Sequence, residues 1–369
     1  MSITEVAATT VTAPLHTEFV TALRRTGDVE TVVVTVTDDE GNVGHGEAPQ
    51  TWRITGQSLA GATACVTGPL RDALLGRDPL DLNGCLDRVD EAVVGNSAAK
   101  AAVDVALHDL WARRRSLSLV EALGGTAASI ATVVTLAAGD AEQLARSAAD
   151  RVAEGFTALK VKVGVDPAGD LARLTAIRQA VGPNVPIRVD ANQGWTPKES
   201  VRIIRGMEDA SLDIELVEQP TPAHDLDGLA HVTAAVDTTI LADESVHTLR
   251  DLTGVITARA ADAVNIKLAK CGGLRPAQAL MALARSHDIA TTVGSMMEGP
   301  IGVGAMACLA TAHGVDITAD LDAAWWLSDQ DNGLQYCDGA LILPTGPGLS
   351  SITFSSQTGL TRRAEAASD

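Results

Sequence analysis

Two hydrophobic periodicities alternate along most of this chain. Short apolar runs, rich in β-branched residues, indicate buried β-strands. Most of them are followed by a stretch with the apolar spacing of an amphipathic helix, such as residues 167–181 and 276–286. The predicted strands cover residues 130–136, 157–163, 185–190, 214–218, 239–243, 263–268, 289–296 and 317–321.

The polar residues near the ends of these runs recur at regular distances. Lys162 and Asp190 are 28 residues apart, as are Asp190 and Glu218, and the next steps, to Asp243 and then to Lys267, are 25 and 24 residues. Strand–helix units of this size, repeated about eight times, predict a parallel β/α barrel. A doubly wound open sheet is the alternative. The count of eight and the lack of a glycine-rich dinucleotide motif favour the barrel.

The first part of the chain does not follow this repeat. Two strand-like runs, residues 30–37 and 43–47, flank the turn sequence Asp38-Asp39-Glu40-Gly41-Asn42, which predicts a hairpin. Residues 80–94 and 97–115 then show helical spacing. Strands followed by helices predict a separate α+β domain that covers the barrel.

These patterns predict a modified (β/α) barrel with an N-terminal α+β capping domain completed by the C-terminal segment. The capping domain is expected over residues 1–124 and the barrel over 125–343. Residues 344–369 are few and rich in Gly, Ser and Thr. They are therefore expected to return to the capping domain, with a frayed tail after Arg363.

Composition limits the partners. A net charge of −19 argues against nucleic acid and anionic membranes, and 2% aromatic residues argue against base stacking. The run 122–139 is uncharged but too polar for a membrane span. Five scattered cysteines without a C-x-x-C pair, and no basic residue before Arg24, indicate reduced thiols and a cytoplasmic location.

Lysine is scarce in this chain, and its placement is informative. Only six of the 28 basic residues are lysine, yet Lys160, Lys162 and Lys267 lie in apolar strands. Arginine keeps its proton at ordinary pH, whereas a lysine can release it when its pKa is lowered. A catalytic amine is therefore indicated. Lys270 and Lys100 fall near predicted helices and are expected at the surface or behind the site.

Three carboxylates close successive predicted strands: Asp190, Glu218 and Asp243. Strand ends of a parallel barrel converge on one face, where three anions would repel each other without a cation. An all-oxygen set with water suits Mg2+, and the dispersed histidines and cysteines offer no zinc site. The alternative for any single acid is a cap on the next helix.

The predicted strands place the lysines on both sides of this metal. Lys160 and Lys162 lie one strand before Asp190 and, being two residues apart, point to the same side. Lys267 lies one strand beyond Asp243. The alternative is that all three only neutralise carboxylates, but buried ion pairs add little net stability. Catalysis is the favoured interpretation.

At this point the chain resembles the muconate-lactonising subgroup of the enolase superfamily. The resemblance rests on Lys160-x-Lys162, Asp190, Glu218, Asp243 and Lys267, and on residues 44–49 and 101–109 of the capping part. It implies abstraction of a proton next to a carboxylate, with Mg2+ as cofactor, Lys162 and Lys267 as the two bases, and Lys160 as a supporting positive charge. It also implies a homo-oligomer.

The substrate is indicated by two further resemblances. Asp320-Leu321-Asp322 resembles the Asp-x-Asp with which dipeptide epimerases bind a free α-amine, and Asp322 is the discriminating residue. Arg24 matches the arginine that meets the glutamate side chain in alanine–glutamate epimerases. The alternatives are a helix cap with a solvated neighbour for the aspartates, and a surface residue for Arg24. Glu298 matches an acidic family position, with a substrate contact, a supporting role or a purely structural role all open.

The resemblance implies a dipeptide epimerase acting on the C-terminal residue, with L-Ala-D/L-Glu as the expected substrate. Racemisation of N-succinylamino acids or synthesis of o-succinylbenzoate, within the same subgroup, is the first alternative. Those substrates carry no free ammonium group, so Asp322 would be dispensable for them. A metal-loaded binding protein without catalysis is the second, but binding alone does not need a lysine on each side of the metal.

Overall fold

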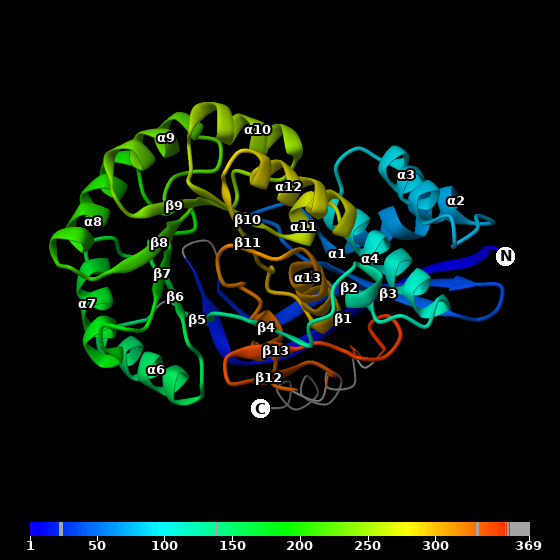
Figure 1. Ribbon diagram of the computed structural model, residues 1–369, viewed down its shortest axis with the longest axis horizontal. Coiled ribbons are helices and arrows are strands. Elements are labelled where there is room, and N and C mark those ends of the chain that lie inside the picture. The colour runs from blue at the N-terminus through cyan, green and yellow to red at the C-terminus, as the bar shows by residue number, and fades with distance from the viewer. Residues whose placement is uncertain (22–24, 138, 330–331, 351, 353, 355–369) are drawn as a thin grey trace, which may run out of the picture.

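The computed structural model describes residues 1–369 except 22–24, 138, 330–331, 351, 353 and 355–369. Its largest part is a curved arc of parallel strands with helices along the outer side, and a smaller antiparallel sheet with its own helices lies against the open side (Figure 1). The fold class predicted from the sequence is confirmed.

The antiparallel sheet contains β1 (Ile3–Val20), β2 (Arg25–Asp38) and β3 (Val43–Pro49) in chain order. β2 and β3 form the predicted hairpin, and the Asp38 side chain accepts hydrogen bonds from the backbone N–H groups of Glu40 and Asn42 in its turn. The chain continues through α1 (Leu59–Cys65), η1 (Val66–Leu70), α2 (Arg71–Leu74), α3 (Leu82–Ala92) and α4 (Ser97–Arg114).

Two glycines of β3 let the long helix α4 lie directly on the sheet. A Cβ atom on Gly44 would lie 2.0 Å from the Ala106 carbonyl oxygen, and one on Gly46 would lie 1.8 Å from that of Ala102. Both distances are far shorter than a van der Waals contact, so backbone packs against backbone here without any intervening side chain. This glycine contact fixes the spacing between the sheet and α4.

The large sheet contains seven parallel strands in chain order, from β5 to β11. Alternate residues on them face the barrel interior and the helix layer, and nearly all are buried, which explains the near-continuous apolar runs of the sequence. The strands are β5 (Val134–Leu136), β6 (Leu159–Lys162), β7 (Ile187–Asp190), β8 (Ile214–Glu218), β9 (Thr239–Ala242), β10 (Ala263–Ile266) and β11 (Ala290–Val293). The helices are α5 (Leu119–Ala122), α6 (Ala141–Ala153), α7 (Asp170–Val181), α8 (Pro197–Asp209), α9 (Leu226–Ala235), α10 (Leu249–Ala258), α11 (Leu268–Cys271), α12 (Leu274–Ser286) and α13 (Pro300–His313).

The eighth predicted strand, residues 317–321, does not form a regular strand. Instead, two isolated parallel bridges, Thr132 with Ala319 and Gly294 with Asp320, connect this segment to both ends of the seven-stranded sheet. The Asp320 N–H donates to the Val293 carbonyl oxygen over 2.8 Å. The ring is therefore closed by a few hydrogen bonds, and the segment ends in the short helix η2 (Ala323–Trp326).

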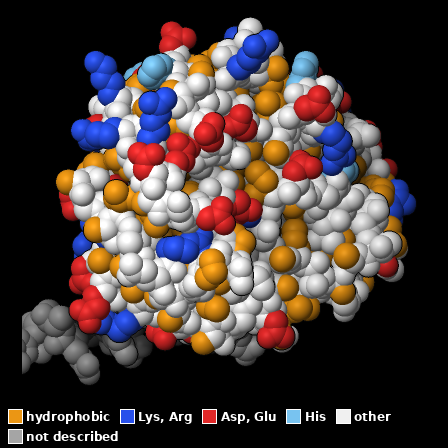
Figure 2. All heavy atoms as spheres, turned by 60° about the vertical axis from the view of Figure 1, so that its left-hand side comes forward, with side chains coloured by type: hydrophobic (Ala, Val, Ile, Leu, Met, Phe, Trp, Pro, Cys, Tyr) orange, Lys and Arg blue, Asp and Glu red, His pale blue; other side chains and the backbone are white. Residues whose placement is uncertain are grey.

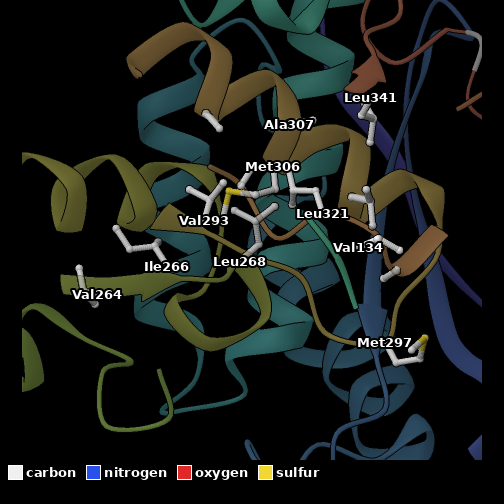
Figure 3. Close-up of a cluster of buried hydrophobic side chains, with 14 of the residues drawn as sticks. Val134, Val264, Ile266, Leu268, Val293, Met297, Met306, Ala307, Leu321 and Leu341 are labelled. Carbon is white, nitrogen blue, oxygen red and sulfur yellow. The ribbon is translucent and has the colours of Figure 1, made fainter. Parts of the chain in front are cut away.

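The core follows from the same alternation. Val293 of β11 and Leu268 of α11 belong to one buried cluster with Met306 of α13, and these side chains lie together in Figure 3. Inside the barrel, Leu216 and Leu241 form a separate small cluster, which also includes Ala263. They lie two residues before Glu218 and Asp243, so apolar side chains fill the barrel below the acidic strand ends.

The first predicted strand, residues 130–136, is divided in two. Its second half is β5, and its first half, β4 (Ser129–Ala131), pairs with β13 (Ala340–Ile342), which pairs with β12 (Gln335–Cys337). Further on, the Gly348 N–H donates to the Leu117 carbonyl oxygen, and the Leu349 N–H donates to Asp109 of α4 over 2.7 Å. The predicted return of residues 344–369 requires contacts of this kind, but the three-domain division stays a prediction. The predicted frayed tail after Arg363 lies outside the described residues.

The outer helices present charges of both signs. On the face that Figure 2 shows, acidic and basic side chains are interspersed rather than separated into large single-sign areas. On α6, for example, Arg146 pairs with Glu142 and Arg151 with Glu154. Within the described part of the chain, every helix is too short or too polar to cross a membrane.

Candidate active site

Three buried carboxylates follow one another around the C-terminal edge of the barrel. Asp190 and Glu218 are the last residues of β7 and β8 and are paired directly in the sheet register. Asp243 follows the last residue of β9. All three side chains are buried. The sequence prediction that the successive strands bring these acids together at one depth therefore agrees with the geometry.

Lys160 forms ion pairs with two of these three acids. Its side chain is 1% exposed, and its ammonium group donates to Asp320 over 2.8 Å. The same nitrogen lies 2.9 Å from Asp190 and 2.6 Å from Glu218. Burial opposes the charged form, but the surrounding carboxylates outweigh it and raise the pKa of Lys160 well above its ordinary value. Lys160 therefore stays a cation in the protein alone.

Lys162 and Lys267 lie at opposite ends of the row of acids. The Lys162 ammonium group, on β6, donates to Asp190 over 2.6 Å, and that of Lys267, just after β10, donates to Asp243 over 2.7 Å. Three strands separate β6 from β10 in the sheet. Both side chains line one cavity of about 460 Å3. A small molecule in this cavity would therefore have an amine on each side.

Two side chains in this row, Glu218 and Lys267, have raised pKa values. Burial and the charge of Asp190 raise the pKa of Glu218 to about 7. Burial disfavours the Lys267 ammonium group, but the charge of Asp243 outweighs this effect and raises the pKa of Lys267. A lysine can act as a base at neutral pH only when its pKa is lowered. The protein side chains alone do not provide it for Lys267, so another cation near Asp243 would be needed.

The donor atoms suit a hard divalent cation, although the acids do not converge as a chelate. Among the described residues, no group of three acidic, histidine or cysteine side chains is arranged as a metal site. Ammonium groups occupy the carboxylate oxygens instead: Lys160 lies between Asp190 and Glu218, and Lys267 and Lys270 bind Asp243. Around them, the buried oxygen atoms Asn192 Oδ1, Asn265 Oδ1 and Glu244 Oε2 have no hydrogen-bond partner. An all-oxygen set with unpaired buried acceptors favours a hydrated Mg2+ ion, once the lysines release the carboxylates.

Two aspartates line the cavity on the side where the ring closes. Asp320 accepts from Lys160, and although burial opposes it, this charge lowers the pKa of Asp320. The Oδ2 atom of Asp322 accepts from the Thr135 N–H over 2.7 Å and from the Trp326 indole N–H over 3.1 Å. Burial and the charge of Asp320 raise the pKa of Asp322. Both carboxylates can face a ligand, as the period of two predicts.

Of the other two predicted substrate contacts, only Glu298 lies within the described residues. Arg24 lies outside the described residues, but its neighbour Arg25 lines the cavity and forms an ion pair with Glu18. Glu298 is buried behind the cavity and accepts from the Met296 N–H over 3.2 Å, and Met296 rather than Glu298 is part of the described lining. Burial and the charge of Glu47 raise the pKa of Glu298 well above its ordinary value. This position favours a supporting role over a substrate contact.

Lys270, expected at the surface or behind the site, is buried directly against Asp243. Its side chain is 2% exposed, and its ammonium group donates to Asp243 Oδ1 over 2.6 Å, to the Asp243 carbonyl oxygen and to the Asn265 carbonyl oxygen over 3.0 Å. Asp243 thus has one lysine on each carboxylate oxygen. The lysine at 270 follows Lys267 by three residues, which is one turn of the short helix α11, and that spacing was the available signal.

Two asparagines and a glutamate also belong to the site. The Asn192 side chain donates to Glu244 over 3.2 Å, and the Asn192 N–H donates to Asp190 over 2.8 Å. The Asn265 side chain donates to Glu218 over 3.0 Å. Both asparagines stand two residues from a predicted site residue in the sequence. Asn192 follows Asp190, and Asn265 precedes Lys267.

Comparisons with known proteins agree with this geometry. A family model for the mandelate racemase / muconate lactonizing enzyme N-terminal domain matches residues 3–124, and one described as enolase C-terminal domain-like matches residues 143–354. L-Ala-D/L-Glu epimerase from Bacillus subtilis (strain 168) is 41% identical over 355 residues, which are 95% of this chain and 97% of that protein. N-succinyl-L-Arg/Lys racemase from Bacillus cereus is 31% identical over 95% of both chains.

The similar solved structures include complexes with ligands. A substrate-liganded complex of the Bacillus subtilis L-Ala-D/L-Glu epimerase has a TM-score of 0.91 at 42% identity and covers 95% of this chain and 98% of that one. A dipeptide epimerase from Enterococcus faecalis V583, complexed with Mg and the dipeptide L-Leu-L-Tyr, has a TM-score of 0.89 at 35% identity, with 95% and 99% covered.

Proposed function

The chain belongs to the mandelate racemase / muconate lactonizing enzyme family of the enolase superfamily, and we propose that it is a Mg2+-dependent dipeptide epimerase. The reaction inverts the α-carbon of the C-terminal residue by proton transfer between two lysines, with L-Ala-D/L-Glu as the substrate. One observation carries the proposal: Lys162 and Lys267 lie on opposite sides of a row of carboxylates and line the same cavity.

Three acids would hold the metal. Asp190, Glu218 and Asp243 supply carboxylate oxygens, and the unpaired oxygen atoms beside them can accept from water molecules on the ion. When bound, Mg2+ supplies positive charge that stabilises the second negative charge which builds up on the substrate carboxylate during deprotonation. Asp190 and Asp243 would release Lys162 and Lys267 on turning to the ion, which would free both amines to face the substrate carbon.

The lysines then have complementary tasks. One of Lys162 and Lys267 enters as a neutral amine and accepts the α-proton, while the other enters as an ammonium group and delivers a proton to the opposite face of the same carbon. Their roles exchange in the reverse direction. Lys160 remains a cation behind the acids. To contact the substrate carboxylate directly, it would have to leave at least one of its three partners.

The aspartates define which end of the substrate is recognised. Asp320 and Asp322 line the cavity and would accept hydrogen bonds from the free ammonium group of a dipeptide. The similarity to L-Ala-D/L-Glu epimerases supports a preference for glutamate at the C-terminal position of the dipeptide. Arg24 is the residue that we assign to the side-chain carboxylate of this glutamate. We also propose that the protein is a cytoplasmic homo-oligomer, which light scattering and cell fractionation would test.

Proton NMR in D2O tests the reaction. With Mg2+ present, the α-proton signal of the C-terminal residue of L-Ala-L-Glu or L-Ala-D-Glu should disappear while the second epimer accumulates, and EDTA should stop both changes. If no member of a broad dipeptide panel takes up deuterium at this position, the proposal is rejected.

N-succinylamino-acid racemisation is the second candidate, because a similar protein is named for it. Its substrates have no free ammonium group. The Asp322→Ala variant should therefore lose dipeptide turnover but retain N-succinyl turnover, if the protein has any. Equal loss of the two activities would mean that Asp322 does not recognise the amine.

A further inference from the structure

Asp322 is oriented by a side chain outside the cavity. Asp322 accepts a hydrogen bond from the backbone N–H of Thr135, which a side-chain substitution leaves in place, and a second one from the Thr135 side chain. Another comes from the Trp326 indole N–H, four residues further along the chain. Trp326 itself is not part of the cavity lining, so a dipeptide would meet Asp322 without touching the indole.

Helix η2, which carries Trp326, is attached to the first strand of the capping sheet. Leu15 of β1 forms an isolated antiparallel bridge with Leu327, immediately after η2. The Ser328 N–H donates to the Pro14 carbonyl oxygen over 2.9 Å. The backbone that follows Trp326 therefore keeps its place relative to β1.

Aromatic contacts from β1 hold the indole ring. The His16 ring stacks on the Trp326 ring at a centroid distance of 5.2 Å and an interplanar angle of 9°. Phe19 meets the same ring edge-on at 5.1 Å and 83°. Such arrangements fix the ring plane because each has a preferred geometry. The direction of the indole N–H thus depends on two residues of the capping strand.

The indole also borders a second cavity. This cavity of about 450 Å3 is lined by Trp326, His16 and Arg151, and also by Thr135, which lines the first cavity as well. Trp325 of the same helix meets the Trp326 ring edge-on at 5.4 Å and 88°. The two contacts from β1 therefore supplement one local neighbour in holding the ring.

We propose that Trp326 is a positioning residue that orients Asp322 for the substrate ammonium group, and that His16 and Phe19 of β1 hold Trp326 in place. The inference rests on the proposed epimerase function. Asp322 follows a segment joined to the sheet only by isolated bridges, so the indole N–H adds a fixed donor beside the Thr135 N–H. Recognition of the amine is thereby linked to the capping sheet.

The Trp326→Phe variant tests this role, because it keeps an aromatic ring and removes the N–H donor. The assay compares two ligands: L-Ala-L-Glu as substrate, and N-propionyl-L-glutamate, which lacks only the amine, as inhibitor. We expect KM for the dipeptide to rise about tenfold, at the lower end for a hydrogen bond to a charged group, with little change in kcat. The inhibition constant of the analogue should stay unchanged. Trp111→Phe is the control for loss of a tryptophan, because Trp111 lies on α4 and the guanidinium group of Arg115, just after this helix, lies over its ring.

A purely structural role gives a different result. Damage to the fold would weaken both ligands together, and either this outcome or unchanged kinetics for both would overturn the inference. His16→Leu provides a second test without touching η2, and it should produce the same selective rise in KM even if Trp326→Phe does not fold. If the unmodified protein turns over no dipeptide at all, the proposed function fails instead, and the two failures remain distinct.

Discussion

Lys270 provides the sharpest test of how the row of acids is held together. The Lys270→Met substitution keeps an unbranched side chain of similar length and removes the ammonium group that binds Asp243 Oδ1 and two carbonyl oxygens. Asp243 keeps Lys267 on its other oxygen. The buried carboxylate would then be only half compensated.

The expected loss of stability follows from this geometry. Removing one partner of a buried ion pair costs about 3–5 kcal/mol, and the remaining lysine places this case near the lower value, about 3 kcal/mol. An unfolding entropy of about 2.1 cal/mol/K per residue gives about 0.8 kcal/mol/K for 369 residues. The melting temperature should therefore fall by about 4 °C.

The measurement is thermal unfolding in EDTA, so that no divalent ion compensates Asp243. Lys100→Met is the matched control, because Lys100 donates to the Asp90 carbonyl oxygen near the surface. It should stay within about 0.5 kcal/mol of the unmodified protein. If the two variants melt at the same temperature, the ammonium group of Lys270 does not stabilise the acid row, and the reasoning is refuted.

Three further predictions follow. Lys267→Ala should stop deuterium exchange from one epimer of the substrate and retain it from the other, as followed by proton NMR; racemisation that persists would exclude the two-base assignment. The melting temperature of Glu298→Gln should rise relative to that of the unmodified protein as the pH increases above about 4.3, the ordinary Glu pKa. Above this pH the glutamate ionises in the unfolded chain but not in the folded protein, where its pKa is raised, so the unmodified protein loses stability and the Gln variant does not. A difference that does not change with pH would contradict this. Gly46→Ala should destabilise the protein by at least about 1–3 kcal/mol, the ordinary cost of overpacking, because the new Cβ meets the Ala102 carbonyl oxygen. Denaturant titration measures this loss. Gly27→Ala is the control and should change stability little, because the space around Gly27 is open.

The repeated part of the site could be predicted from the sequence because it follows a period. Asp190 and Glu218 end apolar strands, and parallel strands place their ends at one edge, so the row of acids follows from spacing alone. The flanking positions of Lys162 and Lys267 follow from strand order in the same way. The predicted strand over residues 317–321 became two isolated bridges, since its short run had to meet both ends of an already curved sheet.

The remaining features depend on contacts between distant segments. Lys270 is polar and lies on a short helix, so a local pattern does not show that it turns inward to Asp243. The bond from Trp326 to Asp322 requires the turn of η2, and the raised pKa of Glu298 depends on its burial and on the charge of Glu47 from the capping sheet. Arg24 lies outside the described residues, so its proposed contact with a glutamate side chain depends on the family resemblance.

The glycine contact between β3 and α4 also limits how a substrate can enter. Backbone atoms meet there without side chains that could change rotamer, so sheet and helix can neither slide nor separate without losing the whole contact. The capping sheet and α4 should therefore move as one rigid unit. The small loop of residues 51–57 also lines the first cavity, through Trp52 and Ile54, and it closes on itself through the bridge between Thr51 and Gln57. Flexing of this loop, with Gly56 at a φ of +71°, would admit a ligand while the capping sheet and α4 keep their places.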